Sequence, residues 1–172
     1  MLTEILYHGV GTTTIDGISA TAIRVVLGVF FLLSGYHKLF NAQRHAAIVT
    51  TMIQDHVPFP WFNCWFVPII EFSGGMALIV GLLSPLAASG LFVICLVATL
   101  ADGLKRIKAW KPLDDADYAD DVLYLPEVLY CVMLVPTIIG GAGPYSMDAL
   151  IYRMVNEPLY LGRGMLAAFN LG

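Results

Sequence analysis

Four long apolar stretches, separated by short breaks, dominate the hydrophobic pattern of this chain. A helix needs about 20 consecutive apolar residues to cross the hydrocarbon core of a bilayer. Stretches of about that length run over residues 18–40, 61–83, 85–104 and 122–140. The pattern therefore predicts an all-α membrane protein, in which four transmembrane helices form an antiparallel bundle.

Proline marks the breaks between these stretches. Pro58 and Pro60 separate the first two, because proline is a poor residue for a helix interior. Pro85 follows the second stretch at once, and proline is common in the first turn of a helix. Short connections place successive helices side by side and antiparallel. Both chain ends should then lie on one side of the membrane, with loops 41–60 and 105–121 on the other.

A different pattern follows the fourth stretch. The sequence Gly-Ala-Gly-Pro-Tyr-Ser over residues 141–146 predicts a turn. Residues 146–156 then mix apolar side chains with Asp148 and Arg153. This mixture predicts a short amphipathic helix at the membrane interface, with Ser146 as its N-cap.

The composition agrees with a protein that contacts lipid. Of the 172 residues, 58% are hydrophobic and 13% are charged, and the mean hydropathy is +0.76. A soluble domain usually carries about twice that charged fraction. We therefore expect residues 1–172 to form a single membrane domain. The net charge of −4 argues against a nucleic-acid partner, because there is no basic patch to neutralise phosphates.

Lysine and arginine are distributed unevenly between the two sides. The side of the long loops carries Lys38, Arg44, Lys105, Arg106, Lys108 and Lys111, and the side of the chain ends carries Arg24, Arg153 and Arg163. An excess of these residues favours the cytoplasmic side. We expect an integral protein of the bacterial inner membrane, with both long loops in the cytoplasm and both termini outside.

Several ionisable residues fall inside the apolar stretches, where a charge is costly. Glu71 lies near the middle of the second stretch. A helical rise of about 1.5 Å per residue places five such residues in the half of the bundle near the loops: His37, Lys38, Glu71, Asp102 and Glu127. Arg24 lies nearer the opposite side, although its long side chain could reach toward Glu71.

Three interpretations of these charges stay open. They form a polar network that holds the helices together, or they form a site for a polar headgroup, a quinone or a proton, or some of them, above all Lys38, only extend to the membrane interface. We expect Glu71 to take up a proton or to pair with a cation, because burial disfavours an unpaired carboxylate.

Other cofactor chemistry finds little support in the sequence. None of the four histidines lies in the second, third or fourth stretch, so a haem held between two histidines inside the membrane is not expected. Cys64, Cys95 and Cys131 are far apart and form no CxxC pair. They predict no metal site, and we interpret them as small packed hydrophobic residues.

The polar and glycine positions of these stretches resemble a known family. The first stretch reads RVVLGVFFLLSGYHKL from Arg24, the second reads EFSGGMALIVGL from Glu71, and GAGPYSMD follows Gly140. In their order and spacing, over about residues 20–150, these segments are similar to the DoxX family of small four-helix membrane proteins.

The resemblance implies a redox setting without a defined activity. Members of the family resemble the membrane component of thiosulfate:quinone oxidoreductase, and others are linked to membrane redox complexes. By resemblance, Arg24, Lys38 and Glu71 are polar positions of the family pattern with no assigned role. The Asp-rich insert at 105–121 is not part of that pattern, and we expect it to contact a partner subunit.

Three hypotheses about function follow. The first is a membrane subunit of a quinone-linked oxidoreductase, with quinone as a non-covalent cofactor. The second is a non-catalytic structural or assembly subunit of a larger membrane complex. The third, a small-molecule transporter, is least favoured because the sequence shows no inverted repeat. The chain carries no catalytic signature of its own, so it is at most one subunit of an enzyme.

Overall fold

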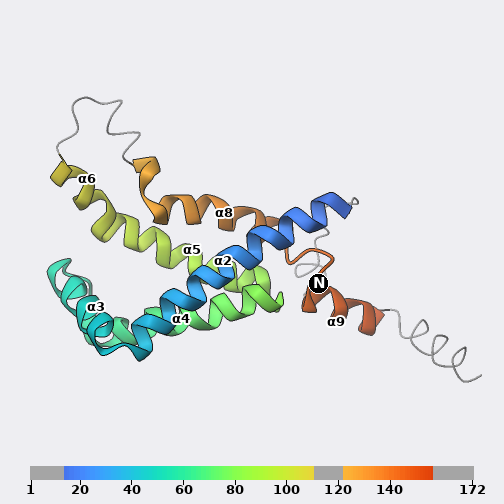
Figure 1. The fold of residues 1–172 in the computed structure, drawn as a ribbon, viewed down its shortest axis with the longest axis horizontal. Helices are drawn as coiled ribbons and strands as arrows, with labels where there is room; N and C mark the ends of the chain where they lie inside the picture. Colours follow the sequence, from blue (N-terminus) through green and yellow to red (C-terminus); the bar gives the residue numbers. More distant parts are fainter. Residues whose placement is uncertain (1–13, 111–121, 157–172) are drawn as a thin grey trace, which may run out of the picture.

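The computed structural model describes residues 14–110 and 122–156, and the regular structure in these residues is helical (Figure 1). The helices are α2 (Thr14–Phe40), α3 (Ala42–Gln54), α4 (Pro60–Val80), α5 (Ser84–Ala98), a π-helical turn η1 (Thr99–Gly103), α6 (Leu104–Trp110), α8 (Pro126–Gly140) and α9 (Met147–Asn156). The all-helical fold class expected from the sequence is confirmed for this part of the chain.

Three helical segments within the described residues are long and apolar enough to cross a membrane: Gly17–Phe40, Pro60–Val80 and the continuous segment Ser84–Ile107. They correspond to the first three apolar stretches. The segment expected over 122–140 is a helix of only 15 residues, because Leu125 is extended and Pro126 starts the helix. At about 1.5 Å per residue α8 is shorter than the hydrocarbon core. The length of α8 therefore does not confirm the expected fourth span, although α8 packs against the same core as the three longer segments.

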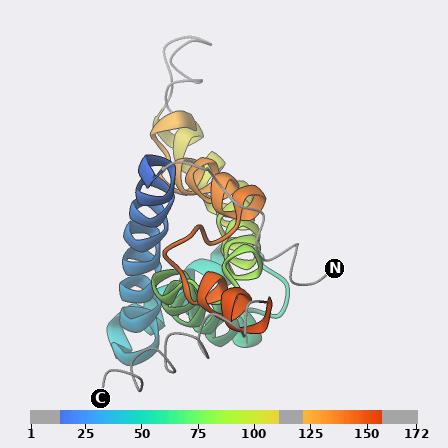
Figure 2. The same cartoon turned by 90° about the vertical axis from the view of Figure 1, so that its right-hand side faces the viewer.

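The helices surround a common core, and the segment 141–146 with α9 covers one end of it (Figure 2). The core consists of one set of buried side chains from α2, α4, α5 and α8: Leu27, Phe31, Leu78, Ala88, Leu91, Cys95 and Leu134. Many apolar side chains point outward instead, among them Val26, Val93 and Val132. Such a surface would be unfavourable in water but suits contact with lipid.

Glycines bring the backbones of α2 and α4 into contact. A Cβ atom on Gly28 would lie 2.8 Å from the carbonyl oxygen of Gly75, and one on Gly75 would collide with the backbone of Leu32. A Cβ on Gly35 would lie 2.5 Å from the amide nitrogen of Phe72. Small residues at such positions allow the close helix packing that stabilises membrane bundles. This contact fixes which faces of α2 and α4 meet.

The region expected as the loop 41–60 contains a helix, α3, that the sequence interpretation missed. Asn41 is its N-cap, and the Asn41 side-chain oxygen accepts hydrogen bonds from the backbone of Gln43 and Arg44. The expected loop 105–121 also begins as helix, because α6 continues to Trp110. The rest of that loop lies outside the described residues.

The expected helix over 146–156 is confirmed as α9. Its predicted cap is also present, because the backbone N–H of Ala149 donates to Ser146 Oγ at 3.1 Å. At the other end of the bundle lie α3 and α6, which an ion pair links: Lys105 Nζ lies 2.8 Å from Asp55 Oδ1. The end of the bundle with α3 and α6 is called the loop end below, and the end with α9 the terminal end (Figure 1).

Candidate functional site

Glu71 on α4 is buried and bound by two side chains of α2. Lys38 Nζ lies 2.7 Å from both carboxylate oxygens, and Ser34 Oγ donates to Oε2 at 3.1 Å. Ser34 and Lys38 are one helical turn apart, so both face α4. The glycine contact between α2 and α4 brings the short Ser34 side chain within reach. These residues, Ser34, Lys38 and Glu71, form the Glu71 cluster.

The two side chains of the ion pair between Lys38 and Glu71 differ in burial. Glu71 is only 5% exposed, whereas the Lys38 side chain keeps 30% of its surface exposed. Lys38 can therefore reach the surroundings of the bundle, but Glu71 cannot. A buried carboxylate that loses its cation is strongly disfavoured. The ammonium group of Lys38 therefore balances the charge of the buried Glu71 carboxylate.

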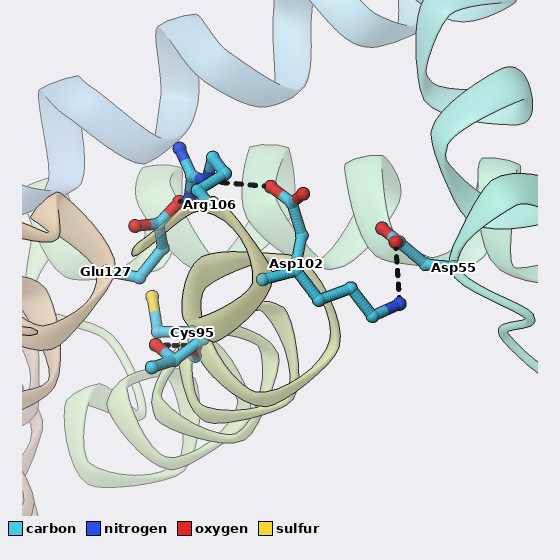
Figure 3. Close-up of polar contacts among 7 residues, drawn as sticks. Asp55, Cys95, Asp102, Arg106 and Glu127 are labelled. Carbon is cyan, nitrogen blue, oxygen red and sulfur yellow. Dashed lines mark hydrogen bonds and ion pairs between the residues drawn. The ribbon is translucent and has the colours of Figure 1, made fainter. Parts of the chain in front are cut away.

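A second charged group joins α8 to the end of the long third segment. Arg106 Nη2 donates to Glu127 Oε1 at 2.7 Å, and Arg106 Nε lies 2.9 Å from Asp102 Oδ2 without hydrogen-bond geometry (Figure 3). Asp102, Arg106 and Glu127 form the Arg106 cluster. One cation is shared by two carboxylates, so with all three ionised the cluster carries a net negative charge. Glu127 Oε2 is buried and has no hydrogen-bond partner among the described residues.

The π-helical turn η1 contains Asp102 of this cluster. Thr99 Oγ1 donates to the carbonyl oxygen of Cys95 at 2.8 Å at the start of the turn. Gly103 is buried, and a Cβ there would lie 3.1 Å from the Leu125 side chain. The turn thus brings the backbone close to the start of α8, where Glu127 lies. Single π-helical turns inside α-helices are frequent at functional sites.

Aromatic rings connect α2 to α8 beside these charges. The ring of Tyr130 lies 4.2 Å from that of Phe30 and 5.6 Å from that of Phe31, between centroids. Phe30, Phe31 and Tyr130 form the aromatic group. Ser34 follows Phe31 by three residues toward the loop end, and Glu127 lies three residues before Tyr130. Phe31 and Tyr130 therefore each lie about one helical turn from a charged cluster, toward the terminal end.

Arg24 belongs to a third cluster, at the terminal end. It is 2% exposed, and its Nη2 donates to the backbone oxygen of Tyr145 at 2.8 Å. Its guanidinium packs against Gly81, whose φ of 75° ends α4. Asp148 accepts from the backbone N–H groups of Leu83 and Ser84, at 2.9 and 3.1 Å, and so caps α5. Arg24, Tyr145 and Asp148 form the Arg24 cluster.

Two of the three segments on which the family resemblance rests, those from Arg24 and from Glu71, lie in residues that match a family model, and the third, at 141–148, lies outside the match. The DoxX family model covers residues 19–102. Over these residues, which are just under half of the chain, the protein matches the DoxX family. No curated protein and no solved structure matches it. The DoxX match contains the whole Glu71 cluster and ends at Asp102, so Arg106 and Glu127 lie beyond the matched residues.

The structure separates the six residues expected at one site of this DoxX-like protein. Lys38 and Glu71 meet in one cluster, and Asp102 and Glu127 meet in another. His37 is exposed, and its ring lies 5.7 Å from that of Tyr36, away from both clusters. Arg24 points to the terminal end, so its side chain does not reach Glu71.

Sequence reasoning missed Ser34, Arg106 and Tyr130 as members of the site. Helical spacing could have identified the first two, because Ser34 precedes Lys38 by one turn and Arg106 follows Asp102 by one turn. Tyr130 gave no such indication, since its contact depends on how α8 crosses α2. Among the described residues, no group of three or more metal-binding side chains is placed to hold a metal ion.

Proposed function

We propose that this DoxX-like protein is the membrane subunit of a quinone-linked redox complex, and that a quinone headgroup binds beside the Glu71 and Arg106 clusters. The observation that carries the proposal is the position of both clusters in the loop-end half, next to the aromatic group. One cluster belongs to α2 and α4, and the other to η1, α6 and α8.

The chemistry of a quinone fits these groups. Its ring is flat and apolar and stacks well on aromatic side chains such as Phe30 and Tyr130. Its two carbonyl oxygens accept hydrogen bonds, and each cluster contains a cationic donor, Lys38 in one and Arg106 in the other. Reduction to a quinol also takes up two protons, and a carboxylate can carry a proton to a bound group. The buried Glu127 Oε2, which has no partner among the described residues, supports such a role.

A quinone-binding assay tests the proposal. The full chain is purified in mild detergent, incubated with decylubiquinone, and the retained quinone is extracted and quantified. We expect wild-type protein and His37→Gln to retain quinone, because His37 lies outside both clusters. Glu71→Gln and Arg106→Gln should lose most of it. Equal retention by all four proteins, or none by wild type, would reject the proposal.

A structural or assembly role is the second candidate, and one observation favours it. Both Glu71 oxygens are already bound by Lys38, as expected for an ion pair whose task is to join α2 to α4. In this case the protein would co-purify with a partner complex, and Glu71→Gln would weaken that association without affecting quinone retention. Native gel electrophoresis of mildly solubilised membranes distinguishes the two roles.

The loop end is proposed to face the cytoplasm of a bacterial inner membrane. Lys38, Arg44, Lys105 and Arg106 lie toward this end, and Arg24 and Arg153 toward the other. The 105–121 region would then present its acidic residues to a cytoplasmic partner subunit. A cysteine introduced at the exposed Gln54 should react with an impermeant maleimide only in inverted vesicles. Labelling in intact cells would reverse the assignment.

A further inference from the structure

Two of the three cysteines, far apart in sequence, meet between α5 and α8. Cys131 Sγ lies 3.9 Å from the carbonyl oxygen of Phe92, one turn before Cys95. Cys95 follows Phe92 by about one turn on the same helix, so the Cys131 thiol lies beside the part of α5 that carries Cys95. Cys95 is 4% exposed and Cys131 is partly exposed. Cys64 lies apart on α4, where its thiol donates to the Trp61 carbonyl at 3.1 Å.

The pair borders the Arg106 cluster. Figure 3 shows the Cys95 side chain directed toward Glu127, and Cys131 follows Glu127 by one helical turn on α8. Glu127 Oε2 is buried without a partner among the described residues, so it can accept a proton from a thiol. Tyr130 of the aromatic group is the neighbour of Cys131 in sequence.

We propose that Cys95 and Cys131 are a redox-active dithiol, which a quinone bound at the adjacent site oxidises to a disulfide. The inference rests on the proposed function, since it requires a bound quinone. Two S–H bonds break and one S–S bond forms. The two electrons and two protons pass to the quinone, whose carbonyl oxygens become the hydroxyl groups of a quinol.

Glu127 has a specific part in this reaction. A thiolate, not a thiol, is the reacting form of cysteine. Glu127 Oε2 takes the proton of one thiol and passes it to a quinone oxygen, which allows the reaction inside an apolar bundle. The sulfur atoms then need to approach to about 2.04 Å. Because α8 packs against α5 at these residues, side-chain rotation and a small shift of α8 bring the two sulfur atoms together.

The test measures thiols in the full-length protein, reduced and then handled without oxygen. Decylubiquinone is added, remaining thiols are alkylated, and peptides are mapped by mass spectrometry. We expect alkylated thiols to fall from the three of the sequence toward one, with a Cys95–Cys131 link. Cys64→Ser should still form the link. Cys131→Ser and Cys131→Ala should retain both remaining thiols.

Quinone retention measured on the same samples separates the two proposals. Quinone that binds to wild-type protein while both thiols stay alkylated would overturn the dithiol inference and leave the proposed function standing. Absence of bound quinone would overturn both. A parallel sample treated with the thiol oxidant diamide tests whether the two thiols are close enough to form a disulfide. If diamide forms the Cys95–Cys131 link but bound quinone does not, the inference is also rejected.

Discussion

Replacement of Lys38 by methionine isolates the energetic role of the Glu71 cluster. Methionine keeps much of the side-chain volume but removes the ammonium group that binds both Glu71 oxygens at 2.7 Å. Breaking a buried ion pair from one side costs about 3–5 kcal/mol. The Lys38 side chain is 30% exposed, which weakens the pair through solvent screening, so we expect a loss of about 2–3 kcal/mol in unfolding free energy.

A double-mutant cycle gives the sharper measurement. Glu71→Gln alone leaves Lys38 charged, but this side chain can turn outward, so the loss should be about 1–2 kcal/mol. In the double variant no charge remains, and the loss should fall well below the sum of the two single losses. Unfolding in mixed micelles with increasing dodecyl sulfate measures all four proteins. His37→Gln is the control, with a change within about 0.5 kcal/mol. Additive losses would refute the reasoning.

Two further predictions concern packing and capping. Gly75→Leu should prevent close packing of α2 and α4, because a Cβ there collides with the Leu32 backbone. We expect this variant to aggregate in size-exclusion chromatography. Gly90→Ala is the control and should elute normally, because the nearest atom to a Cβ at Gly90 is 3.7 Å away. Asp148→Ala removes the cap of α5 and should lower the unfolding free energy by about 1–2 kcal/mol, with faster proteolysis near α9. A protease pattern unchanged from wild type would argue against the docking of α9 through Asp148.

The sequence predicted that Glu71 would either take up a proton or pair with a cation, and the structure shows the pair with Lys38. The sequence did not predict the separation of the charged residues into clusters. Helical rise gives depth along the bundle, and depth alone placed Lys38, Glu71, Asp102 and Glu127 in one half. Which of them meet depends on rotation about each helix axis. Gly28 and Gly75 set that rotation for α2 and α4, and this contact could not be derived from a single sequence.

Other differences have local physical causes. Arg24 binds a backbone carbonyl at Tyr145, and its partner could not be predicted because any residue type offers a carbonyl. The helix α3 was missed although Asn41 is a typical N-cap residue, because its mixed polar and apolar residues lack a long hydrophobic run. α8 starts four residues later than expected because Pro126 stands at its first turn.

The two ends of the bundle differ in a way that bears on function. At the terminal end, Asp148 and Arg24 are buried and bind backbone groups of α5 and residue 145, and this arrangement holds helices together. At the loop end, Arg106 is shared between two carboxylates, one Glu127 oxygen has no partner among the described residues, and Lys38 remains partly exposed. Arg24 Nε and Nη1 also have no partner among the described residues, but Arg24 is only 2% exposed, so a ligand cannot reach it. The side chains of Lys38 and Arg106 are 30% and 41% exposed and can exchange partners with a ligand. A polar ligand from the membrane would therefore be recognised at the loop end.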